Sequence, residues 1–319
     1  MPLTEKQVKE RVNYLGGGDA AAILGLSRYR TALGVWAAKT NQIAHKDISQ
    51  ELPVKLGNML EEAVSQLFTE ETGKQLKTLK DTIFHPKYKM LGGNLDRELI
   101  DENAFFEAKT TNSFKQSEWE EEGEIPIEYQ IQCHHYLAIS GYNRAYIGCL
   151  IGNRKFVWRV IKRNQKLLDD MIAKEVAFWR TFIEPVITGK KPASECMPIV
   201  TANDSGILYT LYPQAAPESI IELDDEAQKI CELRDSSLAD LKVLEKQIDE
   251  YTNTLKAKLT TYETGMTARY KITWKNQPER RLDAARLKME EPALYEKYAP
   301  PKEKRALRVA VRKAEIGRR

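Results

Sequence analysis

The sequence lacks the features that mark secreted proteins, membrane-spanning proteins and metal-cluster proteins. Its 319 residues include four cysteines, and no two of them have the CxxC spacing of zinc ribbons, redox dithiols or iron–sulfur sites. The N-terminal MPLTEKQVKERV has no apolar signal-peptide core, and no uncharged apolar run of about 18 residues occurs. We therefore expect a cytoplasmic protein with ordinary thiols and no membrane span.

An excess of charge of one sign is also missing. The chain has 49 Lys and Arg against 46 Asp and Glu, and a net charge of +3 does not by itself indicate a nucleic-acid-binding protein. Any basic surface must therefore come from local clustering. Hydrophobic residues make up 42% of the chain and no low-complexity run interrupts them, so we expect a substantial folded core.

Hydrophobic periodicity predicts a mixed α/β fold for the first part of the chain. Helices are expected over about 3–14, 53–72, 127–140 and 164–187, and short strands between 76 and 109. Two further strands, YNRAYIGCLIG and KFVWRVIK, are joined by a Gly-Asn turn. The break GGGD ends the first helix, and Asp19 is expected to be the N-cap of the next one.

The composition changes near residue 190, which predicts a domain boundary. We expect a first domain over 1–190, an irregular connection over 191–222, and an extension over 223–319. The extension begins with a long helical pattern whose apolar residues alternate steps of three and four. This helix either folds back on its own subunit or joins an oligomeric coiled coil. A strand around Ile272 and a basic tail from Pro300 follow.

The segment GGNLDRELIDENAFFEAKTTN contains the residues that carry chemistry. If LDRELI and AFFEAK form one hairpin, Glu107 and Lys109 share a face about 6.5 Å apart, and Asp96 meets them across the pair. Converging carboxylates make a hard-oxygen site suited to Mg²⁺ or Mn²⁺. A neighbouring ammonium orients or helps to deprotonate an attacking water. The pattern therefore predicts phosphodiester hydrolysis.

Residues outside this segment support the same site. Glu61 lies on or beside the apolar face of its helix, where an unpaired charge is costly unless it binds something. Tyr129, Gln132 and Tyr136 share one helix face, and the Gln can bond a carboxylate, a water or a phosphate. Arg28 follows the glycine-rich turn and is either a DNA-phosphate contact or a solvated surface residue.

Four blocks in this order resemble the YqaJ viral recombinase family, the lambda-exonuclease-like branch of the PD-(D/E)XK nucleases. They are GGGDAAAILGLSRYRTALGVW, KLGNMLEEAVSQLF, GGNLD with FFEAKT, and IEYQIQCHHYLAISGY, and the resemblance covers about residues 5–190. It implies a restriction-endonuclease-like core with a central mixed sheet flanked by helices. The region beyond is similar to the C-terminal extension of such phage proteins, a possible partner- or DNA-binding element.

The resemblance implies a phage or prophage exonuclease of the bacterial cytoplasm that needs Mg²⁺, with Mn²⁺ as substitute and two ions per site. Such an enzyme digests linear double-stranded DNA from 5′ to 3′ and leaves 3′ single-stranded tails. The implied partners are a single-strand annealing protein of the RecT type and further copies of the chain in a ring-shaped trimer.

The resemblance also assigns roles to residues. Asp96, Glu107 and Glu61 would hold the metals, and Glu61 would also support the geometry of the metal or the terminal phosphate. Lys109 would activate or position the nucleophilic water, and Gln132 would be the helix glutamine of the motif. Arg11, seven residues before Gly18, stands where the family grips the 5′-phosphate. The family usually has Ser at the position of Gly18. The backbone N–H groups of Gly17, Gly18 and Asp19 can still form an anion-binding turn.

Three alternatives remain open. A PD-(D/E)XK endonuclease would use the same residues on internal sites, and a Cas4-like nuclease would need a tight cysteine group that is missing. A catalytically silent recombination scaffold would bind DNA and an annealing protein without cleavage. The intact set of Asp96, Glu107 and Lys109 disfavours the scaffold.

Overall fold

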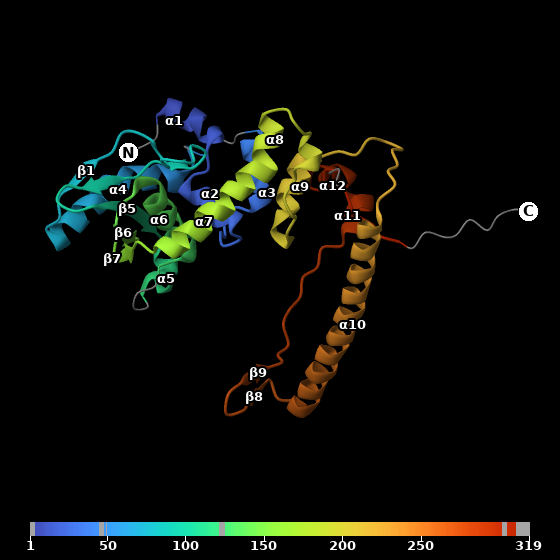
Figure 1. Cartoon of the computed structure of the whole chain (residues 1–319). Coiled ribbons are helices and arrows are strands. Elements are labelled where there is room, and N and C mark those ends of the chain that lie inside the picture. Colours follow the sequence, from blue (N-terminus) through green and yellow to red (C-terminus); the bar gives the residue numbers. More distant parts are fainter. Residues whose placement is uncertain (1–3, 45–47, 49, 121–124, 302–304, 311–319) are drawn as a thin grey trace, which may run out of the picture. The chain divides into compact units, whose positions relative to one another are not determined.

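The computed structural model describes residues 4–44, 48, 50–120, 125–301 and 305–310 (Figure 1). The chain forms two compact units, Met1–Pro213 and Gln214–Arg319, and the division falls within the expected connection over 191–222. The part of that connection up to residue 213 belongs to the first unit and contains helix α9, Ser205–Leu211. Most of the basic tail lies outside the described residues.

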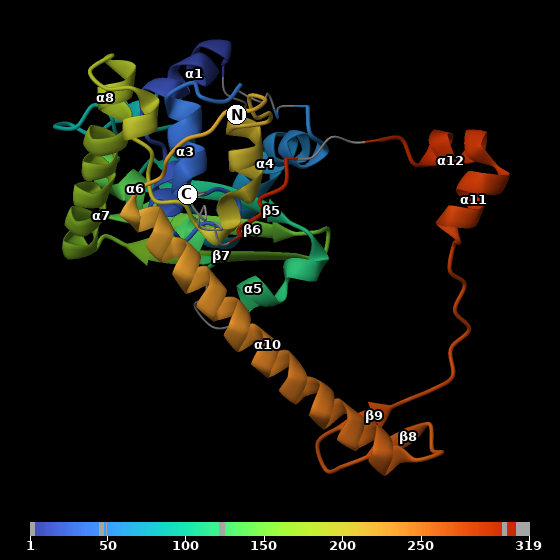
Figure 2. The ribbon, with the colours of Figure 1, turned by 90° about the vertical axis from the view of Figure 1, so that its right-hand side faces the viewer.

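A five-stranded mixed sheet forms the centre of the first unit, in the order β1-β4-β5-β6-β7. Its strands are β1 Leu76–Thr78, β4 Arg97–Leu99, β5 Ala104–Thr111, β6 Arg144–Ile151 and β7 Lys155–Lys162. Strands β5 and β6 are parallel, and every other neighbouring pair is antiparallel. Figure 2 shows β5, β6 and β7 side by side. Parallel neighbours need a long crossover, which here contains helix α6, Ile127–Ser140. The predicted mixed α/β class is confirmed.

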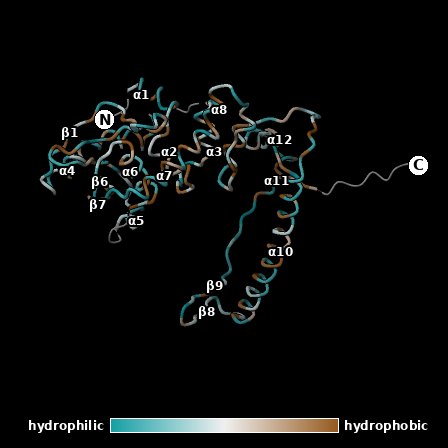
Figure 3. Tube along the Cα trace, in the orientation of Figure 1, coloured by the Kyte–Doolittle hydropathy of each residue, from teal (hydrophilic) through white to brown (hydrophobic). Residues whose placement is uncertain are grey.

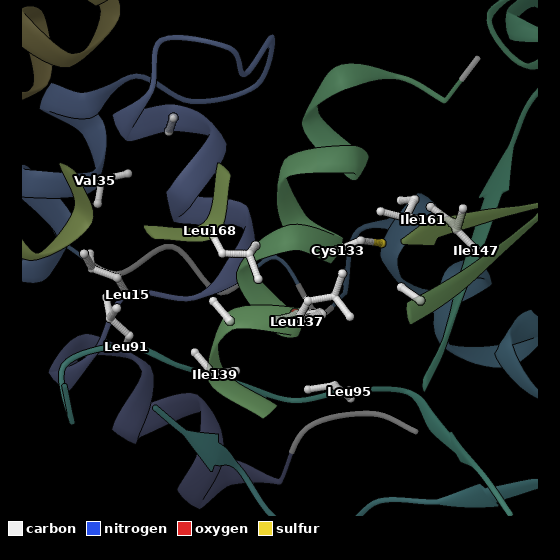
Figure 4. Packing of buried hydrophobic residues seen from close by; sticks show 14 of the residues in the cluster. Leu15, Val35, Leu91, Leu95, Cys133, Leu137, Ile139, Ile147, Ile161 and Leu168 are labelled. Atoms are coloured by element: carbon white, nitrogen blue, oxygen red, sulfur yellow. The ribbon is translucent and has the colours of Figure 1, made fainter. Parts of the chain in front are cut away.

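Helices cover both faces of this sheet. On one face lies α4, Leu52–Thr72, whose Phe68 stacks on Phe106 of β5 with ring centroids 4.4 Å apart. The other face packs under α6 in the main hydrophobic cluster, part of which Figure 4 shows around Leu137 and Ile147. Side chains alternate along a strand. Because Phe105 faces α6, Glu107 and Lys109 share that side.

Helices at both ends of the first unit differ in detail from the prediction. The N-terminal helices are α1 Glu5–Glu10, α2 Gly17–Ile23 and α3 Ala32–Lys39, and a short 3₁₀ turn, Arg11–Asn13, follows α1. The prediction that Asp19 caps α2 is wrong. Gly16 is the N-cap, and Asp19 at the third helical position accepts a hydrogen bond from the Gly16 N–H at 3.0 Å. The helix expected over 164–187 is α7, Gln165–Phe178, then a π-helical turn and α8, Glu184–Ile187.

A long helix, α10 Asp225–Leu259, dominates the second unit. It begins at the N-cap Asp224, whose Oδ1 accepts from the Ala227 N–H at 2.9 Å. The unit also contains β8 Thr264–Met266, β9 Lys271–Thr273, α11 Ala284–Glu290 and α12 Pro292–Tyr298. Figure 3 shows apolar segments recurring along α10. The predicted seam runs from Leu241 to Tyr262. Its residues up to Leu255 are 41–67% exposed and Tyr262 is 72% exposed, whereas Leu259 is buried.

None of the helices in the described part of the chain combines the length and apolar character that a membrane crossing requires.

Candidate active site

The β4–β5 hairpin brings the three predicted residues Asp96, Glu107 and Lys109 together. Arg97 pairs with Phe106 in the ladder, and the same register continued by one residue places Asp96 opposite Glu107. The carboxylate Oδ2 of Asp96 accepts a hydrogen bond from the Ala108 N–H at 2.8 Å. Lys109 Nζ lies 2.7 Å from Glu107 Oε1. The hairpin therefore sets two carboxylates and an ammonium at one point of the sheet.

Helix α6 completes the surroundings of Glu107. The side-chain amide of Gln132 donates to Glu107 Oε1 at 2.7 Å, and the same nitrogen lies 3.2 Å from the Tyr136 hydroxyl. One oxygen of Glu107 thus receives both Lys109 and Gln132. The other oxygen, Oε2, is buried and has no hydrogen-bond partner among the described residues. A buried carboxylate oxygen without a hydrogen-bond partner is available to a ligand.

Glu61 reaches the same cavity from α4, but it is paired. The cavity has a volume of about 300 Å³ and is lined by Val54, Gly57, Asn58, Glu61, Asp96, Glu107, Ala108, Lys109 and Thr110. Glu61 is 8% exposed and forms an ion pair with Arg97 Nη1. The second Arg97 nitrogen, Nη2, lies 2.9 Å from Glu62. Arg97, which the sequence analysis did not single out, therefore offsets the buried charge of Glu61.

Burial dominates the electrostatics of the site. It raises the pKa of Asp96 to about 8, with a further contribution from the negative charge of Glu107. Burial also raises the pKa of Glu107. For Lys109, burial acts to lower the pKa, but the carboxylates of Glu107 and Asp96 outweigh it and raise the pKa. Two ionised carboxylates in this cavity require more positive charge than Lys109 supplies.

The residues fit a divalent cation held in an open site. Among the described residues, no three His, Cys, Asp or Glu side chains form a ready-made metal cage. Mg²⁺, however, commonly uses one or two carboxylates and keeps several waters or takes substrate oxygens. Asp96 and the unpaired Oε2 of Glu107 match that ligand set. The raised pKa values of Asp96 and Glu107 also fit a cation site, because a bound cation would stabilise the ionised forms of the two carboxylates.

The residues expected to bind a 5′-phosphate differ in their exposure to solvent. Arg11 and Gly18 are both exposed. Asp19 is buried, and its carboxylate pairs with Arg30 at 2.6 Å and with Lys39 at 2.9 Å. Burial acts to raise its pKa, but these two cations lower it to about 2. Asp19 therefore organises the turn from inside and does not present its side chain to solvent.

Arg28 is engaged by two glutamates. Its Nη1 and Nη2 each lie 2.9 Å from a carboxylate oxygen of Glu118. Its Nε and Nη2 also donate to Glu128 Oε1, at 2.9 and 2.7 Å. These contacts carry no signal in the sequence, because both glutamates are about a hundred residues away from Arg28 along the chain.

His135 belongs to a buried pair behind the site. Its Nδ1 lies 2.7 Å from Glu175 of α7 and its Nε2 lies 3.1 Å from the Gly92 carbonyl of the short strand β3, Gly92–Gly93. Burial acts to lower the pKa of His135, but Glu175 outweighs it and raises the pKa. His135 thus holds α6 in place. The cysteines are free, and three of the four are buried.

Comparisons with known proteins identify the family of this chain. The YqaJ-like viral recombinase domain profile matches residues 7–143. The chain is 32% identical over 290 residues to the protein YqaJ of Bacillus subtilis (strain 168), covering 90% of this chain and 88% of that protein.

Solved structures share the fold of the first unit. An alkaline exonuclease, LHK-Exo from Laribacter hongkongensis, is similar with a TM-score of 0.51 and 18% identity, covering 60% of this chain and 98% of that chain. Its complex with dAMP gives the same values. At this identity the likeness establishes the fold, whereas the relative that matches along nearly the whole chain establishes the family. The chain belongs to the YqaJ-like viral recombinase domain family.

Proposed function

We propose that this protein is a metal-dependent deoxyribonuclease that digests linear double-stranded DNA from its 5′ ends and leaves 3′ single-stranded tails. The observation that carries the proposal is the cavity in which Asp96, Glu107 and Lys109 meet, with one buried Glu107 oxygen left unpaired. Family membership and the alkaline exonuclease fold support the reaction class.

Asp96, Glu107, Lys109 and Gln132 have separate tasks in this reaction. Asp96 and Glu107 would hold Mg²⁺, with Mn²⁺ as a substitute and two ions per site by resemblance to the family. The bound cation supplies charge neutralisation at the scissile phosphate and a lowered pKa for the attacking water. Lys109 orients that water and stabilises developing negative charge. Gln132 fixes the rotamer of Glu107 through its 2.7 Å hydrogen bond.

Recognition of the DNA end would use the N-terminal turn. We assign the 5′-phosphate to the guanidinium of Arg11 and the backbone of Gly18, both of which are exposed. Asp19 supports this turn from below, and Arg28 contacts the DNA backbone when the phosphate competes with its glutamates. The 3′ tails would pass to a single-strand annealing protein of the RecT type, and a ring of three subunits would keep the enzyme on its duplex.

The reaction is tested with a linear duplex that carries a 5′-phosphate and a distinct label at each end. We expect loss of label from the 5′ ends only, in Mg²⁺ and not in EDTA, with a circular duplex left intact. Cleavage of the circle would instead indicate a PD-(D/E)XK endonuclease. An absence of cleavage with Mg²⁺ and with Mn²⁺ would leave the DNA-binding scaffold.

A further inference from the structure

An aromatic side chain stands almost fully in solvent beside the strand that carries the site. Phe114 is 96% exposed and lies in a 3₁₀ turn, Ser113–Lys115, that begins two residues after the end of β5. Single exposed apolar residues are common and need no explanation by themselves. The surroundings of Phe114 therefore decide whether its position matters.

The backbone under Phe114 is fixed. The Asn112 side chain accepts a hydrogen bond from the Phe114 N–H at 3.1 Å, which caps the turn. The Gly152 N–H donates to the Thr111 carbonyl at 2.7 Å. A Cβ at Gly152 would lie 2.6 Å from Ser113 Oγ, so the β6–β7 turn abuts this segment closely. The ring is thus presented on a braced turn.

The turn is connected to the candidate active site through tyrosines. Lys115 Nζ lies 3.0 Å from the hydroxyl of Tyr29, which is itself 59% exposed. Burial and the neighbouring Tyr29 raise the pKa of Tyr129, whose ring lies 5.2 Å from Lys109 Nζ. Tyr129 also stacks on the buried Trp119 with ring centroids 5.8 Å apart. The exposed Phe114 and Tyr29 therefore lie beside the aromatic cluster of Tyr129 and Trp119, which contacts Lys109.

The charges around these rings favour one kind of ligand. Lys115 lies next to Phe114 in sequence, and the abutting β6–β7 turn adds the exposed Arg154. Open aromatic faces combined with cations bind single-stranded nucleic acid, because bases stack on the rings and phosphates approach the cations.

We propose that Phe114, together with Tyr29 and Lys115, is a stacking site for an unpaired nucleotide of the DNA strand next to the active site. A base stacks on the Phe114 ring and the adjoining phosphate approaches Lys115. The identity of the ligand as DNA rests on the proposed function, but binding at this surface requires no hydrolysis.

Full-length protein is tested with a fluorescein-labelled single-stranded oligonucleotide in EDTA, where cleavage is prevented, by fluorescence anisotropy. Stacking on an aromatic residue contributes about 1–3 kcal/mol per base, so Phe114→Ala should weaken binding at least about fivefold. Phe114→Leu should weaken it similarly, because it keeps an apolar side chain without a ring, and Phe114→Trp should retain wild-type affinity. Ile199→Ala is the matched control, since Ile199 is 86% exposed on the same unit.

A 2-aminopurine base in the oligonucleotide adds a direct readout, because its fluorescence is quenched by stacking. Wild type and Phe114→Trp should quench it, whereas Phe114→Ala and Phe114→Leu should not. Wild-type affinity in Phe114→Leu would overturn the stacking site. A change of oligomeric state in Phe114→Ala, measured by light scattering, would overturn it as well and assign the ring to a contact between copies.

The outcomes separate this inference from the proposed function. If the wild type digests duplex ends and all variants bind the oligonucleotide equally, the stacking site alone is overturned. Oligonucleotide binding that depends on the ring, without any digestion, would overturn the nuclease and support the stacking site. A wild-type protein that binds no DNA would overturn both.

Discussion

Gln132 on α6 and Lys109 on β5 donate to the same oxygen of Glu107, each at a distance of 2.7 Å. Among the described residues, the second Glu107 oxygen is left buried and without a hydrogen-bond partner. A helix and a strand thus hold the carboxylate in one orientation, and the oxygen without a partner is the one that a cation can take.

Substitution of Lys109 should remove activity without unfolding the protein. Lys109→Ala removes the ammonium that, in the proposed function, would position the water, and we expect kcat on a linear duplex to fall by at least about 100-fold. Asp96→Ala should be as severe, because it removes a proposed metal ligand. Nuclease assays check the loss, and circular dichroism with DNA-binding assays checks that fold and affinity remain. Wild-type turnover by either variant would mean that the site lies elsewhere.

Asp96 should cost stability in the absence of metal. Because burial and Glu107 raise its folded pKa to about 8, far above an unfolded value near 4, its contribution is most favourable below pH 4. That contribution is lost as the pH rises toward 8. Asp96→Asn should therefore raise the free energy of unfolding at pH 7 by at least about 1 kcal/mol in EDTA. Urea titrations at pH 5 and pH 7 measure this, and the gain should be smaller at pH 5.

Metal should stabilise the wild-type protein and should not stabilise Asp96→Asn. Mg²⁺ at a hundred times its Kd should add about 2.7 kcal/mol to the free energy of unfolding, because it binds the folded form only. Thermal melts with Mg²⁺, with Ca²⁺ and with EDTA measure the shift without any catalysis. Equal shifts in the wild type and Asp96→Asn would place the cation at another site.

Two neighbouring glycines should differ in their tolerance of alanine. A Cβ at Gly17 would lie 2.7 Å from Gln132 Cγ and 3.0 Å from the Tyr136 ring, whereas a Cβ at Gly18 meets nothing within 4 Å. Gly17→Ala should displace Gln132 from Glu107, lower kcat and cost about 1–3 kcal/mol of stability. Gly18→Ala is the control and should stay within about 0.5 kcal/mol of wild type. Similar melts and activities for the two variants would show that the close approach is unimportant.

The buried Asp19 should matter most near neutral pH. Its pKa is lowered to about 2, so its stabilising contribution is present above an unfolded value near 4 and is lost as the pH falls toward 2. Asp19→Asn leaves Lys39 buried without its carboxylate and should cost about 3 kcal/mol at pH 7. Glu10→Gln removes the solvent-accessible pair with Lys6 and should cost less than about 0.5 kcal/mol. Denaturant titrations from pH 2 to pH 7 should show the Asp19 difference closing in acid.

The convergence of the site residues was predictable because it depends on strand periodicity over a short distance. Asp96, Glu107 and Lys109 belong to one hairpin, and a period of two fixes which side chains share a face. The cap of α2 was mispredicted because Asp19 serves both the Gly16 N–H and two distant cations. The partners of Glu61 and Arg28 depend on tertiary packing, and a single sequence carries no periodic signal for such contacts.

The length of α10 sets a distance within the second unit. At about 1.5 Å per residue, its 35 residues extend about 50 Å, more than the width of many small domains. The β8–β9 hairpin begins five residues after the end of the helix, and Gly265 there approaches Leu259 closely. The hairpin is therefore held about 50 Å from the residues that begin the helix, as at the end of a rigid spacer.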